Sequence, residues 1–294
     1  MKKILLTGGS GFIGKNILES HLAQKYEIIA PGSKELNLTD SDSVDRYFKD
    51  KKFDAVIHSA CKPGHRNAKD LSGIYYANTR MFFNLAKNKE SFGKFINLGS
   101  GAVYDMEHYE PKMKEDYFGK HIPKDETGFS KYVINKYIEK TDDFTDLRVF
   151  GIYGKYEDYE IRFISNAVCK AVFGLPVTIK QNRIFDYLWI EDLYQVLEFF
   201  IENKAKFKAY NITPDKTVSL FEIAEIIEGI TGKKSEINIS KDGMGPEYSG
   251  DNSRLKAEFT GIAFTPIKKG IEKLYNYYDS NKLHLDRNKL LFDK

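Results

Sequence analysis

A glycine-rich turn near the N-terminus is the first segment whose composition predicts chemistry. It follows an apolar run at residues 4–7 and reads Gly8-Gly9-Ser10-Gly11-Phe12-Ile13-Gly14. Glycines let the backbone approach a diphosphate, and a helix beginning there presents unpaired N–H groups to it. A turn of this kind between a strand and a helix predicts binding of NAD(H) or NADP(H). We expect the cofactor to contact Gly8, Gly11, Phe12, Ile13 and Gly14.

The end of the expected second strand bears on the choice between the two cofactors. An acidic residue about 20 residues after the glycine turn is typical of NAD-selective proteins. At that point the chain has Ser33 and Lys34, and no carboxylate precedes Glu35. A hydroxyl and an ammonium group can bind a 2′-phosphate. We therefore favour NADP(H), with NAD(H) as the alternative.

Further segments resemble the extended short-chain dehydrogenase/reductases, the nucleotide-sugar epimerase/dehydratase family, over nearly the whole chain. Residues 7–14 resemble the motif TGGxGFIG, 99–104 the motif SSxxVYG, 148–154 the motif RxxNVYGP, and 186–192 the motif DFVYVDD. The resemblance also implies contacts with the cofactor beyond the glycine turn. These are made by Asn37, Leu38, Ser59, Ala60 and Asn78.

The resemblance implies a catalytic set of a Ser or Thr, a Tyr, and a Lys four residues after the Tyr. Ser100 stands at the serine position and Lys131 at the lysine position, where the ammonium would lower the phenol pKa and bind the nicotinamide ribose. The tyrosine position holds Thr127. A phenol has a pKa of about 10, and an aliphatic hydroxyl is a far weaker acid.

Thr127 leaves three interpretations open. A different residue supplies the proton, with Tyr104 the best candidate and Tyr132 behind it. Alternatively, the protein is a cofactor-binding pseudoenzyme. The third interpretation is that Thr127 is an introduced change in an ordinary enzyme.

The expected substrate is a nucleotide-diphosphate sugar. The resemblance implies that Arg183 and Arg254 bind its diphosphate, although either is equally consistent with a surface charge. Gly151 and Lys155 depart from the Asn and Pro of the RxxNVYGP motif, so the sugar or its mode of binding differs from the common hexoses.

The leading function is reduction of a 4-keto-deoxy sugar nucleotide for surface-glycan biosynthesis, with a nucleotide-sugar 4-epimerase as the alternative. A 4,6-dehydratase is disfavoured, because Gly101 and Ala102 follow Ser100 in place of the Asp/Glu pair that such an enzyme needs.

Alternating apolar runs and helical stretches predict the elements that position these residues. We expect strands at 4–7, 26–30, 55–60, 95–98, 147–150 and 209–212, and helices at 13–24, 42–50, 74–87, 127–140, 161–173, 191–202, 219–229 and 267–278. Ser219 and Glu222 have the spacing of a capping box. Residues 235–265 are expected to be irregular, and 279–294 a loosely held tail.

The predicted fold class is α/β, a Rossmann-type doubly wound parallel sheet with a smaller C-terminal α/β substrate domain. The cofactor domain would comprise residues 1–155 with about 184–212 returning to the sheet, and the substrate domain about 156–183 and 213–294. The resemblance implies that the helices at 74–87 and 127–140 pair between subunits in a homodimer.

The composition excludes several other classes of protein. The 45 Lys and Arg nearly balance the 42 Asp and Glu, which leaves no charge footprint for nucleic acid or a membrane surface. Cys61 and Cys169 lack the number and spacing of a disulfide framework or a metal site, so we expect no metal. The N-terminal apolar run stops at Gly8, too short for a signal peptide, and we expect a cytoplasmic protein.

Overall fold

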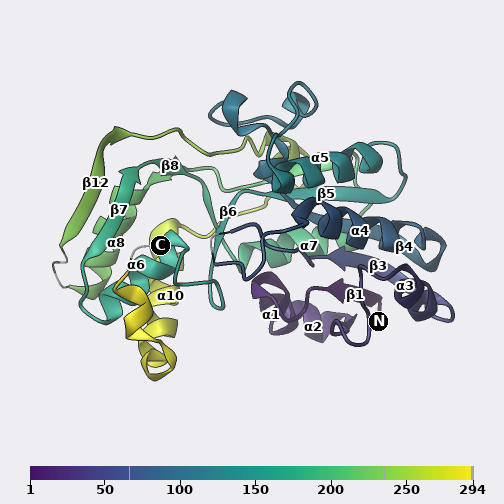
Figure 1. The fold of residues 1–294 in the computed structure, drawn as a ribbon, viewed down its shortest axis with the longest axis horizontal. Helices are drawn as coiled ribbons and strands as arrows, with labels where there is room; N and C mark the ends of the chain where they lie inside the picture. The colour runs from purple at the N-terminus through teal and green to yellow at the C-terminus, as the bar shows by residue number, and fades with distance from the viewer. Residues whose placement is uncertain (66, 233, 235, 293–294) are drawn as a thin grey trace.

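The computed structural model describes residues 1–65, 67–232, 234 and 236–292. Its centre is a parallel sheet of six strands in the order β10-β5-β4-β3-β1-β2 (Figure 1). The strands are β1 (Lys3–Thr7), β2 (Glu27–Ile29), β3 (Phe53–His58), β4 (Phe92–Ser100), β5 (Phe144–Val149) and β10 (Ala209–Ile212). The strand order reverses between β1 and β3, which is the switch point where doubly wound sheets bind ligands. The predicted fold class is confirmed, and so is the return of residues 209–212 to the sheet.

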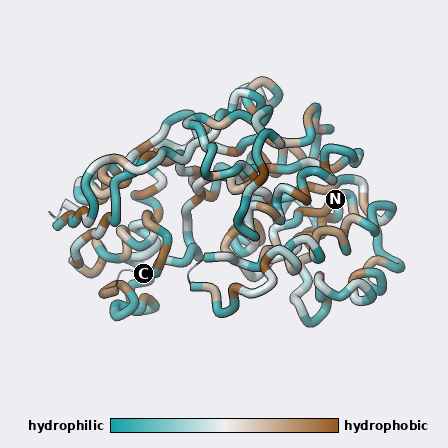
Figure 2. The backbone as a smooth tube through the Cα atoms, turned by 45° about the horizontal axis from the view of Figure 1, so that its top comes forward, coloured by the Kyte–Doolittle hydropathy of each residue, from teal (hydrophilic) through white to brown (hydrophobic). Residues whose placement is uncertain are grey.

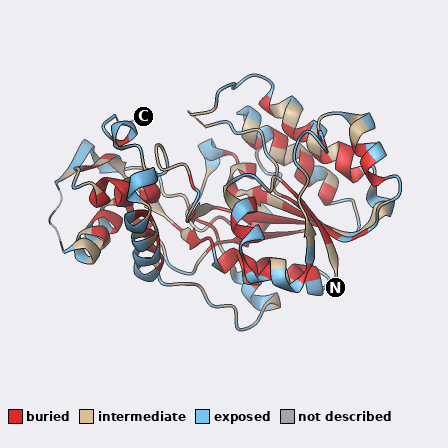
Figure 3. Ribbon diagram, turned by 90° about the horizontal axis from the view of Figure 1, so that it is seen from below, coloured by how far each residue is buried: buried red, intermediate tan, exposed pale blue. Residues whose placement is uncertain are grey.

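Side chains of β1 alternate between two cores, because successive residues of a strand point to opposite faces. Ile4 and Leu6 pack with Ile17 and Leu193, whereas Leu5 joins the other core. Helices therefore cover both faces, and Figure 3 shows the buried strands between them. One face carries α1 (Phe12–Leu18), α2 (His21–Lys25) and α7 (Asp192–Glu202); the other carries α3 (Ser41–Phe48), α4 (Ile74–Ala86) and α5 (Glu126–Ile138).

The prediction of one helix over residues 13–24 is wrong, because α1 ends at Leu18 and a separate helix, α2, begins at His21. Ser20 is the N-cap of α2, and its Oγ accepts a hydrogen bond from the Leu22 N–H at 3.2 Å. The same hydroxyl donates to the Ile17 carbonyl at 2.7 Å, which satisfies part of the end of α1. Serine competes with helix continuation through such local bonds.

A second lobe lies at the carboxyl-terminal side of the fold, drawn on the left of Figure 1. It contains α6 (Phe163–Val172), β7 (Val177–Asn182), β8 (Ile184–Phe185), β11 (Val218–Ser219), α8 (Leu220–Thr231), β12 (Ile237–Met244) and α10 (Ile267–Ser280). The capping box predicted for α8 is confirmed, since Ser219 and Glu222 each bond the other's backbone N–H. A short parallel pair, β6 (Gly151–Tyr153) with β9 (Tyr187–Trp189), lies where the chain leaves and rejoins the sheet. The predicted domain boundaries stay a prediction.

Two expectations for the carboxyl-terminal part are wrong. Residues 235–265 include β12 and a short helix, α9 (Ser253–Glu258). Most residues of β12 are polar or exposed, which hides the strand from any reading of apolar alternation, and Figure 2 shows its hydrophilic colouring. The part of the predicted tail up to residue 292 is also held, because Leu290 is only 1% exposed and belongs to the main core, whereas residues 293–294 lie outside the described residues. In the described part of the chain, we find no helix with the length and apolar character to cross a membrane.

Candidate active site

The glycine turn follows β1 and lies directly against the end of β3. Gly8 has a φ of +73°, and a Cβ on it would lie 2.7 Å from the Ala60 backbone nitrogen. A Cβ on Gly14 would lie 2.2 Å from the Gly8 carbonyl oxygen. No side chain fits at either position, so the backbone itself forms the surface of the turn.

The first turn of α1 has the donors that a diphosphate needs. Gly11 is the N-cap, no side chain caps this helix, and its first turn holds no acidic residue. The N–H groups of Phe12, Ile13 and Gly14 therefore keep their hydrogen-bonding capacity at the positive end of the helix. A surface of glycine backbone with free N–H groups fits the diphosphate of a dinucleotide.

A buried hydrogen-bonded group joins β1 to β3 beneath this turn. Thr7 Oγ1 lies 2.8 Å from His58 Nδ1 and accepts from the Ala60 N–H at 3.3 Å. His58 is 5% exposed, and burial, followed by the charge of Lys131, lowers the pKa of His58 to about 3. His58 is thus a neutral core residue, and the Lys131 ammonium lies close enough to lower the pKa of its imidazole.

Acidification should destabilise the protein through His58. The unfolded chain binds a proton at His58 near pH 6.5, whereas the folded chain binds none until about pH 3. Stability from this residue is therefore present at neutral pH and falls as the pH drops below about 6.5, by about 2 to 3 kcal/mol at pH 4.5. Urea unfolding at both pH values should show that His58→Gln reduces the loss by this amount. His284→Gln, at an exposed histidine, is the control, and equal losses in both variants would contradict the assignment.

The residues after β2 that were expected to contact the cofactor differ in their exposure and in their hydrogen bonds. Ser33 and Lys34 are exposed, and neither has a hydrogen bond or an ion pair with another described residue. Asn37 uses its Oδ1 to accept from the N–H and hydroxyl of Thr39. The Leu38 side chain is 8% exposed and packs in the core of α3 and α4, and its carbonyl accepts from Asn84 Nδ2 at 2.8 Å. Its backbone N–H is the group that remains for a cofactor.

Asn78 on α4 positions a loop. Its Oδ1 accepts from the Lys62 N–H at 2.7 Å, and its Nδ2 donates to the Lys62 carbonyl at 3.2 Å. Both ends of the amide are therefore occupied by the chain that follows Ser59 and Ala60. The expected direct contact between Asn78 and the cofactor is not what this geometry favours.

Ser100 ends β4 with its hydroxyl oriented by the next turn. Its Oγ accepts from the Ala102 N–H at 3.2 Å, which leaves the hydroxyl proton free to be donated. The amino end of α5 packs here, since a Cβ on Gly128 would lie 2.7 Å from the Ala102 carbonyl. The structure thus brings the turn after Ser100 together with the start of the helix that carries Thr127 and Lys131.

Thr127 lies under the loop that follows β3. Its Oγ1 would be 2.5 Å from a Cβ on Gly64, so backbone covers the hydroxyl closely. Lys131 lies one turn further along α5, and its side-chain ammonium makes no hydrogen bond or ion pair with a described residue.

Tyr104, the first candidate for a replacement acid, lies in the core. It is 1% exposed; its hydroxyl donates to Asn211 Oδ1 at 2.8 Å and accepts from Arg148 Nη1 at 2.7 Å. Burial raises the pKa of Tyr104 to about 12. Tyr132, the second candidate, packs its ring against Phe118 at 5.1 Å. Both placements favour structural roles over proton transfer.

The two expected diphosphate ligands contact different parts of the fold. Arg254 is ion-paired with Asp116 and donates to the Ala209 carbonyl at 3.2 Å, at the edge strand β10. These contacts give Arg254 a structural role, and its expected role as a substrate ligand stays a prediction. Arg183 donates to the Pro246 carbonyl at 2.9 Å, which anchors the chain just before Tyr248.

Tyr248 is the residue near Ser100 that sequence reasoning missed. Its hydroxyl lies 2.5 Å from the position of a Cβ on Gly101. It belongs to the segment 235–265, where no motif or periodicity singled it out. The glycine that follows Ser100 was the one available signal that something approaches that position.

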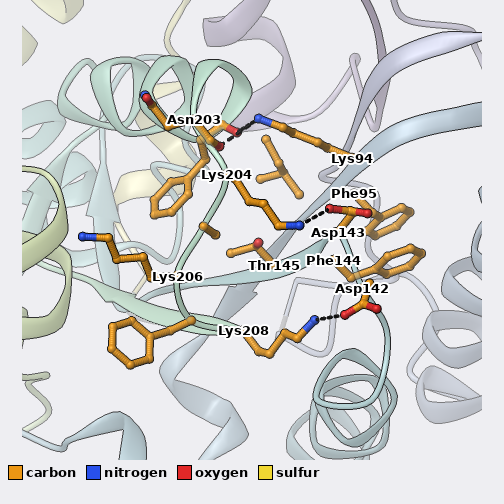
Figure 4. Close-up of a pocket in the computed structure, with 14 residues that line it drawn as sticks. Lys94, Phe95, Asp142, Asp143, Phe144, Thr145, Asn203, Lys204, Lys206 and Lys208 are labelled. Carbon is orange, nitrogen blue, oxygen red and sulfur yellow. Dashed lines mark hydrogen bonds and ion pairs between the residues drawn. The ribbon is translucent and has the colours of Figure 1, made fainter.

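The pocket in Figure 4 lies at the opposite end of the sheet, at the amino ends of β4 and β5, with a volume of about 240 Å³. Lys94 donates to the carbonyls of Ile201 and Asn203 at the end of α7, and Lys208 donates to the Thr141 carbonyl. These lysines therefore hydrogen-bond to backbone carbonyl groups near the ends of α7 and α5. Ligands of parallel α/β sheets bind at the carboxyl ends of the strands instead.

One group among the described residues has metal-ligand composition: Asp105, His108 and His121. The two imidazole rings stack at 3.8 Å with an interplanar angle of 5°. The in-plane lone pairs of parallel rings do not converge on one ion, so this arrangement is not a formed metal site.

Comparison with known proteins gives consistent matches. The model of the NAD dependent epimerase/dehydratase family matches residues 4–213. A GDP-L-colitose synthase of Yersinia pseudotuberculosis is 25% identical over 95% of this chain and 99% of its own length. A GDP-mannoheptose C4 reductase of Campylobacter jejuni, solved with NADP bound, superposes with a TM-score of 0.80 at 21% identity, covering 94% of this chain and 98% of that one. A UDP-glucose 4-epimerase of Thermotoga maritima, solved with UDP-glucose, gives a TM-score of 0.79 at 20% identity over 95% and 99%.

Proposed function

This chain belongs to the NAD dependent epimerase/dehydratase family, and we propose that it is an NADP(H)-dependent reductase of a 4-keto-deoxy nucleotide-diphosphate sugar. The observation that carries the proposal is the pairing of the glycine-backbone surface at residues 8–14 with Ser100, whose hydroxyl proton is free. Relatives named as a sugar-nucleotide synthase and as a C4 reductase support the substrate class.

The residues of this chain divide the work between binding and polarisation. The backbone of Gly8 to Gly14 binds the diphosphate of the cofactor, and Lys131 binds its nicotinamide ribose. The bound cofactor supplies a hydride. Ser100 donates a hydrogen bond to the substrate carbonyl oxygen, where negative charge develops as the hydride adds.

We expect a preference for NADP(H), because Lys34 is an exposed cation without a partner among the described residues. A 2′-phosphate would gain a charge-assisted contact there. Lys34→Glu should reverse the order of affinities and weaken NADPH binding by roughly tenfold or more. Titration by nicotinamide fluorescence measures both affinities, with Lys89→Glu as a control on another exposed lysine. Tighter binding of NADH than of NADPH by the unmodified protein would contradict the preference.

The function itself is tested with a panel of GDP-, dTDP- and UDP-linked 4-keto-6-deoxy sugars and NADPH. We expect oxidation of NADPH with at least one member. A 4-epimerase, favoured by the likeness to the Thermotoga protein, would instead retain its cofactor through purification and interconvert 4-hydroxy sugars. Binding of cofactor and sugar nucleotide without either reaction would mark a pseudoenzyme.

We further propose a homodimer formed through α4 and α5. Both helices carry exposed aromatic side chains, with Tyr76 64% and Phe129 37% exposed. Exposed apolar groups on adjacent helices are typical of an interface.

A further inference from the structure

Reduction of a ketone requires a proton for the oxygen, and this chain has no phenol at the expected helical position. Thr127 is covered by the backbone of Gly64 and is a poor acid. Ser100 donates a hydrogen bond but is no better as a proton source. We propose that Tyr248, from the second lobe, donates the proton to the substrate oxygen, an inference that rests on the reductase function proposed above.

The position of the Tyr248 hydroxyl supports this role. It lies 2.5 Å from where a Cβ on Gly101 would be, and Gly101 is the residue next to Ser100. The hydroxyl therefore approaches the backbone one residue after the group that polarises the carbonyl, at the carboxyl end of β4. Any side chain at position 101 would displace it, so glycine there permits the approach.

The backbone around Tyr248 is held from both sides. The Tyr248 N–H donates to the Ile184 carbonyl at 2.9 Å, and the Gly250 N–H donates to Asp186 Oδ2 at 2.6 Å. The Met113 N–H donates to the Ser249 carbonyl at 2.9 Å. A segment fixed by bonds to two different parts of the fold can hold its side chain in one orientation.

The Tyr248 ring is held in an aromatic slot. It stacks on Tyr109 with ring centroids 5.2 Å apart, and packs on Phe150 at 5.2 Å and on Phe185 at 6.2 Å. These contacts fix the ring plane and leave its edge, which carries the hydroxyl, directed at Gly101. Rigid placement of a proton donor is a large part of its catalytic effect.

The hydroxyl has no competing role in the described structure. It forms no hydrogen bond with a described residue, and the Tyr248 side chain is only partly buried. A group that is neither paired nor sealed can meet a ligand.

The electrostatics keep the Tyr248 phenol protonated before the step. Burial, followed by the neighbouring Asp186 and Tyr104, raises the pKa of Tyr248, and the positive charge of Arg162 lowers it. Tyr109, the other titratable group of the slot, is a neutral phenol whose own pKa is raised by burial. The raised pKa keeps the proton on Tyr248 at the start of the reaction but also makes this phenol a weaker acid than a free one. Transfer therefore depends on the strongly basic oxygen that hydride addition creates, and on Arg162, whose positive charge lowers the pKa of Tyr248.

The step balances in atoms and charge. A hydride from the reduced nicotinamide forms the new C–H bond at the carbonyl carbon, and the C=O π electrons move to oxygen. That oxygen takes the Tyr248 proton to become a hydroxyl. The phenolate is then reprotonated from water, so one ketone, one reduced nicotinamide and one proton give an alcohol and the oxidised nicotinamide.

The test is Tyr248→Phe, which removes only the hydroxyl. We expect kcat/KM for the keto-sugar nucleotide to fall roughly a hundredfold at neutral pH. The unmodified protein should be independent of pH between about 6 and 9, because its donor stays protonated, whereas Tyr248→Phe must draw its proton from solution and lose about tenfold per unit. Tyr109→Phe is the matched control: it removes a phenol hydroxyl bonded to the Ser249 carbonyl in the same slot and should keep the flat profile.

A second measurement needs no turnover. With 3-fluorotyrosine in place of tyrosine, the Tyr248 resonance is assigned by its loss in Tyr248→Phe. We expect addition of NADP⁺ with the 4-hydroxy counterpart of a panel member to shift that resonance, and an unshifted resonance would overturn the inference. Full kcat/KM with an unchanged pH profile in Tyr248→Phe would also overturn it while leaving the reductase function standing. An unmodified protein that reduces no member of the panel overturns the reductase function, and this role of Tyr248 with it.

Discussion

Lys131→Met should lower turnover of the keto-sugar nucleotide by roughly a thousandfold, combining lost cofactor orientation with lost electrostatic stabilisation. The Lys131 ammonium has no hydrogen bond or ion pair with a described residue, yet its charge reaches buried His58. An unpaired cation near His58 is available to a ligand. Methionine keeps the length of the side chain and removes only the charge. Stopped-flow measurement of NADPH oxidation, with NADPH binding titrated separately, resolves the two contributions.

Two comparisons separate this effect from general damage to α5. Lys136→Met changes an exposed lysine of the same helix that pairs with Glu139 at 3.0 Å, and it should keep turnover within about twofold. Lys131→Met should also raise the pKa of His58 toward its ordinary value, because a neighbouring positive charge is gone. Equal activity of the two lysine variants would contradict the role of Lys131.

Proton transfer gives Lys131→Met a further signature. If Tyr248 supplies the proton, the Lys131 variant should be slow but still independent of pH between about 6 and 9. The slope of the pH profile therefore distinguishes loss of cofactor binding from loss of the acid.

The parallel sheet and the glycine turn could be predicted because each requires a recognisable pattern of neighbouring residues in the sequence. Buried strands such as residues 4–7 are continuous apolar runs, and a turn without room for a Cβ must be glycine at positions 8 and 14. The family motifs then extended the prediction to Ser100 and Lys131. The break at Ser20 was missed because the apolar period runs through it.

The roles of residues that depend on partners distant in the sequence could not be predicted. Tyr104 carries a phenol that could act as an acid, but its hydroxyl is hydrogen-bonded to Arg148 and Asn211, which are distant in the sequence. Arg254 was expected to bind a diphosphate, and its ion pair with Asp116 could not be predicted from the sequence. Tyr248 lies in a polar segment without periodicity, and only the folded backbone brings it to Gly101.

The second large effect is expected for stability, in Arg148→Met. Arg148 is 2% exposed, and its guanidinium contacts Asp146 Oδ2 at 3.3 Å, the Tyr104 hydroxyl at 2.7 Å and Asn135 Oδ1 at 3.0 Å. Its removal leaves Asp146, which is 0% exposed, as a buried carboxylate without its cation. The free energy of unfolding should fall by roughly 3 to 5 kcal/mol. Urea unfolding followed by circular dichroism measures it.

The cause of that loss can be isolated by a second change. In Arg148→Met with Asp146→Asn the uncompensated charge is gone, and Asn97, which donates to Asp146 Oδ1, can still donate to the amide oxygen. Much of the lost stability should return, since an unpaired buried charge costs more than the pair contributes. Lys256→Met, which breaks an ion pair with Asp215 in which both side chains are exposed, should cost about 1 kcal/mol or less. Because Arg148 holds Tyr104 at the end of the turn that begins at Ser100, the single variant should also lose turnover where it remains folded. A double variant that regains stability but not turnover would indicate that this network positions Ser100 and does more than support the core.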